Sequence, residues 1–414
     1  MKALRQNKKN WKPITKRNKK TNKILNTIRE SIEGFEPTNT DLSLSTGSVG
    51  NTLFLIWHDL LLSKKSNLDF YFDNLNSKLS TAQIDSSFMN GLSGIAWFYY
   101  FTANSRFVKY DKEFENSLRN IDELILPSIN LEAAKRNIDL FDGLNGYGEY
   151  LIEKGKYDNN YQDLYNLVKN FRKISLDDEN GIRWVDNRKH YNAIQNQTLS
   201  MPEILFGEEV NLGLAHGMLG TIVILSKIYE LGILKTEIKK VLTKSVKWIL
   251  KQKNENENQL FPSVTNNHDH HSNPKIGWCY GDLGIAFSIV FAGNKLQNRE
   301  FINIGIDIAL RCSKDTKIIT KINSPYFCHG AAGITHIYNR LYYLTGETQF
   351  LNQTLYWHGK LIDMYNPNNK IGGFFNEKND FFYGLQFGIA GIGLVLISSI
   401  LKDEPIWDSS LLLS

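Results

Sequence analysis

The feature that most constrains the fold of this chain is a short glycine motif that recurs seven times. Each copy reads Gly-x-x-Gly and is followed by a run of apolar residues. A single copy carries almost no information, but seven copies in register predict an internal repeat with one supersecondary unit per copy. The copies begin at Gly47, Gly91, Gly143, Gly217, Gly281, Gly330 and Gly388.

The residues behind the glycines differ from the segments between them. Residues 95–100 and 285–290 are apolar nearly all round, which is typical of buried helices. Residues 238–250 have an amphipathic helical pattern instead, with one apolar face formed by Ile238, Val241, Leu242, Val246, Ile249 and Leu250. One buried and one amphipathic helix per repeat predict an all-α chain with two concentric layers of helices.

One interval between the motifs is longer than the others. Successive copies begin 44 to 64 residues apart, but Gly143 and Gly217 are separated by 74 residues. The extra residues include an Asn180-Gly181 step with strand-like residues around it, which indicates a turn between two strands. We therefore expect a small insertion with β character at about residues 157–205.

Charge and cysteine content limit the class of protein. Residues 1–23 carry ten Lys and Arg and no acidic residue, so the rest of this +5 chain has a net charge of −5. No apolar stretch follows this segment as in a signal peptide, and Trp11 alone does not favour nucleic-acid binding. We expect a disordered basic tail at 1–23 and one folded domain at 24–414. Three cysteines indicate a reducing compartment, and the apolar runs are too short to span a bilayer, so we expect a cytoplasmic protein.

Two of the three cysteines lie in clusters at the start of repeat helices. Cys279 belongs to a Trp-Cys-Tyr-Gly cluster, and Cys328 is followed by His329 and a glycine. Two thiolates and an imidazole are suitable ligands for tetrahedral zinc, and three protein ligands leave a fourth position open, as in catalytic zinc sites. Cys279, Cys328 and His329 are therefore the candidate metal ligands.

The remaining cysteine and several histidines have simpler interpretations. Cys312 has no ligand-like neighbour and is expected to be a buried hydrophobic residue. His336 lies two helical turns after His329 and is expected in the core. We exclude as ligands the histidines of a polar, loop-like segment, which are His268, His270 and His271.

Over about residues 40–400, these motifs resemble the lanthionine synthetase C-like family, whose best-known members are lanthipeptide cyclases. The resemblance includes Ala215-His216-Gly217 at the fourth repeat, and it is greatest to members in which the cyclase is a separate chain. It implies an α/α toroid of seven inner and seven outer helices over residues 24–414. It also implies zinc at one end of the barrel and an insertion similar to the SH2 fold.

The resemblance also implies a set of site residues. Cys279, Cys328 and His329 match the zinc ligands, His216 matches the acid/base histidine, and Asp139 matches the aspartate that supports it. Tyr280 matches a further active-site position.

Two positions depart from the family pattern. Lys275 replaces the usual Arg, which keeps the charge but loses the planar guanidinium fork. Leu283 replaces a common Pro, and we expect that change to affect loop stiffness rather than chemistry.

The implied activity is zinc-dependent addition of peptide cysteine thiolates to dehydroalanine or dehydrobutyrine, which forms thioether rings. His216 would protonate Cα after the addition, and Lys275 would neutralise the developing enolate oxygen. The implied partners are a dehydrated precursor peptide with a leader segment, a dehydratase and an export transporter. The resemblance thus implies that the expected cytoplasmic protein associates peripherally with the membrane through such an assembly.

Three other functions remain open. A similar zinc site would also support addition of a soluble thiol such as glutathione to dehydrated residues in proteins. A protein prenyltransferase subunit combines an α/α barrel with zinc-held thiols as well, but its zinc set normally includes an Asp and its repeats lack this glycine pattern. The non-enzymatic alternative is a peptide-binding scaffold whose metal site has lost activity.

Overall fold

The computed structural model describes residues 11–35, 41–63, 68–79, 83–185, 209–254, 260–265, 270–271, 276–314, 319–377, 379 and 382–414. The chain consists of two compact units. Unit 1 consists of Met1–Asp85 and Leu310–Ser414, and unit 2 of Ser86–Ala309.

Among the described residues, seven helices begin at the predicted glycine motifs, and the first glycine of each motif is the N-cap. They are buried on nearly every side, which confirms the prediction from their apolar sequences. In unit 1 they are α2 (Ser48–Leu61), α14 (Ala331–Thr345) and α16 (Ile389–Ile400). In unit 2 they are α4 (Leu92–Asn104), α6 (Leu144–Asp158), α9 (Met218–Glu230) and α11 (Asp282–Leu296).

In several motifs the second glycine is required by close backbone packing at the start of the helix, whereas a Cβ atom at Gly284 would meet no atom closer than 3.5 Å. A Cβ atom at Gly333 would overlap the carbonyl oxygen of Phe327, and one at Gly391 would overlap that of Leu385. Any larger residue would push the helix away from the loop before it. Gly333 and Gly391 therefore hold the loops before their helices in a fixed path.

The helices before and between the buried ones are amphipathic. In unit 1 they are α1 (Lys19–Glu33), α3 (Leu68–Leu79) and α15 (Thr348–Asp363), and in unit 2 they are α5 (Lys112–Ala134), α7 (Gln162–Ile174) and α10 (Lys235–Lys251). α12 (Arg299–Cys312) contains the boundary between the units. α10 buries the predicted apolar face except for Leu250, which is half-buried. Each fully buried aliphatic side chain contributes about 1.5–3 kcal/mol.

None of the helices in the described ranges is both long and apolar enough to cross a bilayer.

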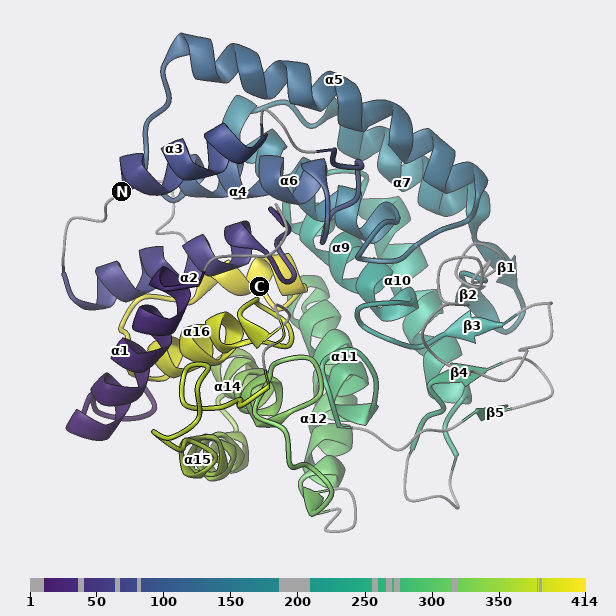
Figure 1. Cartoon of the computed structure of the whole chain (residues 1–414). Coiled ribbons are helices and arrows are strands. Elements are labelled where there is room, and N and C mark those ends of the chain that lie inside the picture. Colours follow the sequence, from purple (N-terminus) through teal and green to yellow (C-terminus); the bar gives the residue numbers. More distant parts are fainter. Residues whose placement is uncertain are drawn as a thin grey trace. The chain divides into compact units, whose positions relative to one another are not determined.

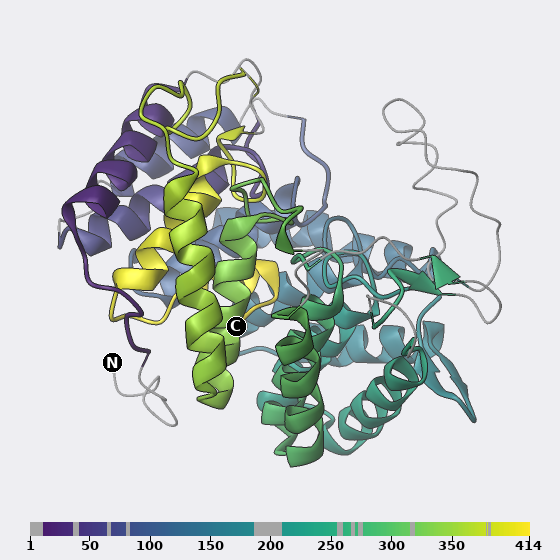
Figure 2. The same ribbon diagram turned by 90° about the horizontal axis from the view of Figure 1, so that it is seen from below.

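The strands of the described residues are short and belong to unit 2 (Figures 1 and 2). β1 (Leu176–Asp178) and β2 (Gly181–Arg183) form an antiparallel hairpin, and Gly181 has a φ of +133° at its turn. The hairpin packs against α10. The predicted turn is therefore confirmed. Of the insertion expected at 157–205, the first part is mostly the helix α7, and residues 186–205 lie outside the described residues.

A second small sheet has the strand order β3-β4-β5. It consists of β3 (Val210–Asn211), β4 (Val264–Thr265) and β5 (His270–His271), and Asn211 pairs with Val264 in antiparallel register. This pairing fixes the backbone a few residues before α9. The sheet therefore positions the loop that holds His216.

The segment before α1 corrects part of the prediction of a disordered tail. Trp11 is 6% exposed, its indole Nε1 donates to the carbonyl oxygen of Ser398 at 3.2 Å, and its ring lies 5.1 Å from the guanidinium carbon of Arg340. α1 begins at Lys19, inside the predicted tail. The basic composition indicated a solvated segment, but this aromatic anchor binds it to unit 1. Residues 1–10 lie outside the described residues.

The C-terminal 3₁₀ helix η2 (Ile406–Leu411) brings a buried carboxylate into unit 1. Asp408 accepts hydrogen bonds from Arg340 Nε at 2.6 Å and Nη2 at 2.7 Å, and it lies 2.6 Å from Nε2 of His336. Burial alone would raise the pKa of Asp408, but Arg340 and His336 lower it to about 2. His336 is 1% exposed, which confirms its predicted core position.

Candidate functional site

The predicted site residues lie in loops that lead into buried helices. In unit 2, His216 directly precedes the N-cap of α9, and Cys279 and Tyr280 directly precede the N-cap of α11. In unit 1, Cys328 and His329 precede the N-cap of α14. The repeat thus places reactive side chains at helix starts, where free backbone N–H groups favour negative charge.

His216 is held by a carboxylate from a preceding loop of unit 2. Its Nδ1 atom lies 2.8 Å from Oδ2 of Asp139, whose side chain is 3% exposed. The other oxygen, Oδ1, accepts the backbone N–H of Phe141 at 2.7 Å, so the orientation of the carboxylate is fixed. With Nδ1 facing the carboxylate, 27% of the His216 side chain remains exposed. The predicted pair is therefore brought together.

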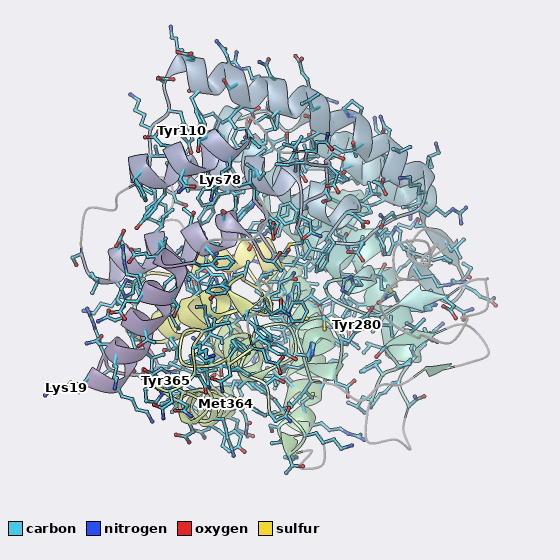
Figure 3. All side chains as sticks on the ribbon, in the orientation of Figure 1. Lys19, Lys78, Tyr110, Tyr280, Met364 and Tyr365 are labelled. Carbon is cyan, nitrogen blue, oxygen red and sulfur yellow. The ribbon has the colours of Figure 1, made fainter. Side chains whose placement is uncertain are left out.

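Aromatic rings define the plane of the His216 imidazole. Phe141 stacks with it at a centroid distance of 4.9 Å, and Tyr280 stacks with it at 5.7 Å. Tyr280 lies at the start of α11 and is labelled in Figure 3. Stacking between flat rings limits rotation about the bond that carries the imidazole. The predicted acid/base histidine and Tyr280 therefore belong to one cluster.

A second carboxylate adds negative charge beside this cluster. Burial, and then the charge of Asp139, raises the pKa of Asp142 to about 6. Asn137 partly offsets these effects by donating to Asp142 at 3.1 Å, and it also donates to Glu132 at 2.8 Å. Asp139 and Asp142 thus place two carboxylates close to His216. Sequence reasoning did not identify Asp142, although it directly precedes the glycine motif.

The loop that carries Cys279 is tightly anchored within unit 2. Gly277 N–H donates to the carbonyl oxygen of Tyr280 at 3.0 Å, and Gly281 has a φ of +117°, which strongly favours glycine. Asp282 accepts the backbone N–H groups of Leu260 at 2.8 Å and Phe261 at 3.1 Å. Cys279 itself is 5% exposed. Backbone hydrogen bonds therefore fix the loop and, with it, the position of Cys279.

The loop of Cys328 and His329 is anchored differently, within unit 1. The backbone N–H of Cys328 donates to the carbonyl oxygen of Gln386 at 3.0 Å. Nε2 of His329 lies 3.1 Å from the hydroxyl of Tyr326, and the rings of Tyr326 and Phe387 stand edge-on to the imidazole. Tyr326 was not identified from the sequence, where nothing but its nearness to the motif marks it.

Cys279, Cys328 and His329 form a group that could hold a metal ion. None of the three cysteines is in a disulfide, so the thiols of Cys279 and Cys328 can serve as ligands. Two sulfur donors and one imidazole nitrogen match the preferences of zinc for soft and borderline ligands. The residues present therefore fit a zinc ion. The third cysteine, Cys312, is 4% exposed and lies in the core as predicted.

Two predictions fall outside the described part of the chain. Lys275, the expected substitute for the family's Arg, lies outside the described residues. The same holds for His268, whereas His270 and His271 form the strand β5.

Comparison with known proteins identifies the family. A family model for lanthionine synthetase C-like proteins matches residues 38–412. The nisin biosynthesis protein NisC of Lactococcus lactis subsp. lactis is 26% identical over 322 residues, which cover 72% of this chain and 73% of that protein. The structure of nisin cyclase superposes with a TM-score of 0.68 at 21% identity, over 95% of this chain and 96% of that chain. The latter likeness confirms the predicted fold, a helical toroid. The chain belongs to the lanthionine synthetase C-like family.

Proposed function

We propose that this protein is a zinc-dependent lanthipeptide cyclase. It would add the cysteine thiolates of a dehydrated peptide to dehydroalanine or dehydrobutyrine and so form thioether rings. The observation that carries the proposal is the group of two cysteines outside any disulfide and one histidine that could hold a metal ion, in a chain of this family. The similarity to a nisin biosynthesis protein supports a peptide substrate.

The ligand set suits thiol chemistry. Cys279, Cys328 and His329 would hold the metal and leave one position for an incoming sulfur. Zinc, when bound there, supplies a positive charge that keeps an incoming thiol deprotonated and nucleophilic at neutral pH. The two protein thiolates balance the charge of the ion, so a third thiolate stays electron-rich.

The His216–Asp139 pair would then complete the addition. The new C–S bond forms at Cβ, and the π electrons of the double bond move onto the carbonyl oxygen. His216, held through Nδ1 by Asp139, would donate a proton from Nε2 to Cα. The proton of the thiol is released to solvent and a proton from solvent restores the imidazolium. The reaction therefore consumes no acid or base.

Lys275, Tyr280 and the partner proteins complete the proposal. Lys275 would stabilise the negative charge on the carbonyl oxygen, as cations do where charge develops in a transition state. Tyr280 stacks with His216 and would contact the same substrate group. A dehydratase must act first, because the substrate contains dehydrated residues. An export transporter and peripheral association with the membrane belong to the same proposal.

The test is ring formation in a peptide that contains one dehydroalanine and one cysteine. The wild-type protein should close the ring faster than the uncatalysed reaction, so that a thiol-alkylating reagent no longer adds mass. Cys328→Ala should remove the catalysed rate, whereas Cys312→Ala should retain it, because Cys312 is a buried cysteine of the same unit outside the ligand group. Full activity of Cys328→Ala would overturn the proposal. Incorporation of added glutathione without ring closure would favour the alternative thiol-addition activity.

A further inference from the structure

Asn211 connects the two loops of unit 2 that carry His216 and Cys279. Its side chain is buried, and it lies in β3, where the backbone pairs with Val264. Its Oδ1 atom accepts the N–H of Gly213 at 2.8 Å, and its Nδ2 atom donates to the hydroxyl oxygen of Tyr280 at 3.0 Å. One side chain therefore contacts both loops.

The direction of these hydrogen bonds is determined by chemistry. A backbone N–H can only donate, so the amide atom that faces Gly213 must be the oxygen of Asn211. The NH₂ group then faces Tyr280, and because it can only donate, the hydroxyl oxygen of Tyr280 accepts. The hydroxyl hydrogen of Tyr280 is consequently directed to an acceptor other than Asn211. A hydroxyl that accepts one hydrogen bond is a stronger donor in the next.

The packing around Asn211 leaves little freedom. A Cβ atom at Gly213 would lie 2.8 Å from the carbonyl oxygen of Cys279 and 2.9 Å from the ring of Tyr280, and one at Gly217 would overlap the backbone of Asn211. The N–H of Leu214 also donates to the carbonyl oxygen of Cys279 at 3.1 Å. The loop before α9 thus lies directly against the loop before α11. Tyr280 is held by its hydroxyl on one side and by its ring stacking on His216 on the other.

We propose that Asn211 is a positioning residue, which orients Tyr280 so that its hydroxyl donates to the carbonyl oxygen of the bound dehydroamino acid. This inference rests on the proposed cyclase function. Negative charge develops on that oxygen during thiolate addition, and a preoriented donor stabilises it without reorganisation. Asn211 acts only through Tyr280 and does not touch the substrate.

The decisive variant is Asn211→Asp, which keeps the shape of the side chain and the acceptor for Gly213 but cannot donate to Tyr280. We expect kcat for ring closure to fall about 10- to 100-fold while KM changes little, because the lost interaction exists in the transition state. Tyr280→Phe should lower kcat at least as much. In the Tyr280→Phe background, Asn211→Asp should have almost no further effect on kcat.

The same variants can also contradict the role inferred for Asn211. An equal loss from Asn211→Asp in both backgrounds would mean that the new charge or a shift of the loop lowers kcat, and would overturn the inference. A fully active Tyr280→Phe variant would also overturn it, even if Asn211→Asp did not fold. Neither result affects the cyclase proposal, since wild-type ring closure tests that proposal alone. Zinc content and thermal unfolding of each variant show whether the fold and the metal group are retained.

Discussion

His216 and His336 each contact an aspartate, and they differ in their exposure to solvent. Nδ1 of His216 lies 2.8 Å from Asp139 in unit 2, and about a quarter of the histidine side chain is exposed. Nε2 of His336 lies 2.6 Å from Asp408 in unit 1, where both side chains are fully buried. A carboxylate partner alone therefore does not indicate a catalytic histidine. Exposure of the histidine to solvent is what differs between the two pairs.

The charges around the two pairs differ as well. Arg340 binds both oxygens of Asp408, which compensates its charge, and burial lowers the pKa of His336. Beside Asp139 the neighbouring charge is instead another carboxylate, Asp142, whose pKa is raised. The buried pair is compensated by a cation, whereas the exposed pair has surplus negative charge.

The largest expected effect is on kcat for ring closure, and it distinguishes His216 from His336. His216→Asn should lower kcat for ring closure by about 10²- to 10⁴-fold, because it removes the proposed proton donor. The free energy of unfolding should change by less than about 1 kcal/mol, since the side chain is partly exposed. Steady-state kinetics and urea denaturation measure the two quantities. The matched variant His336→Asn should behave in the opposite way, and wild-type kcat in His216→Asn would contradict the comparison.

The second-largest expected effect is on the free energy of unfolding, and it distinguishes Asp408 from Asp139. Asp408→Asn leaves Arg340 as a buried cation without its full countercharge and should reduce the free energy of unfolding by about 3–5 kcal/mol. Because the folded pKa of Asp408, about 2, lies below its unfolded value, this contribution is present above about pH 4 and is lost as the pH falls toward 2. Urea denaturation at pH 7 and pH 3 measures it. Asp139→Asn, the control, should destabilise the protein less at pH 7.

A third histidine extends the comparison, since His329 contacts a hydroxyl rather than a carboxylate. Tyr326→Phe removes the hydroxyl that lies 3.1 Å from Nε2 and should weaken zinc binding about 10- to 100-fold, as loss of a ligand's hydrogen-bond partner does. Competition with a coloured chelator measures the affinity. Tyr356→Phe, on an exposed face of α15, provides the control. Equal affinities in the two variants would show that the hydroxyl does not orient His329.

The smallest expected effect concerns Asp142, the second carboxylate near His216. The folded pKa of Asp142, about 6, lies above its unfolded value, so its ionisation opposes folding above pH 6 and this cost disappears as the pH falls toward 4. Asp142→Asn should therefore stabilise the protein at pH 7, by about 1 kcal/mol after allowance for partial exposure. The difference from wild type should vanish near pH 4. Thermal unfolding across this range measures it, and a difference independent of pH would contradict the assignment.

The sequence predicted those parts of the molecule that depend on local patterns. The starts of the seven buried helices follow from glycines whose neighbours are near in sequence, and the apolar face of α10 follows from helical spacing. The hairpin turn at Asn180-Gly181 is a two-residue signal of the same local kind. Such features require no knowledge of distant segments, so a single sequence is sufficient.

Features that join distant segments could not be predicted in this way. Trp11 is anchored to Ser398, 387 residues away, so its basic segment resembled a solvated tail. Asn211 meets Tyr280 across 69 residues and through a strand of only two residues, which has no alternating pattern to detect. The contact of His216 with Asp139 spans 77 residues and was expected only from the family resemblance.

The most direct test of the central claim is the zinc content of the purified protein, measured by elemental analysis. We predict about one zinc per chain in the wild type and in Cys312→Ala, because the Cys312 side chain lies outside the ligand group. Cys279→Ala and Cys328→Ala should each lose the metal, since each leaves only two of three protein ligands. Wild-type protein that binds no zinc when supplied with it, or Cys279→Ala and Cys328→Ala variants that retain a full equivalent, would contradict the account.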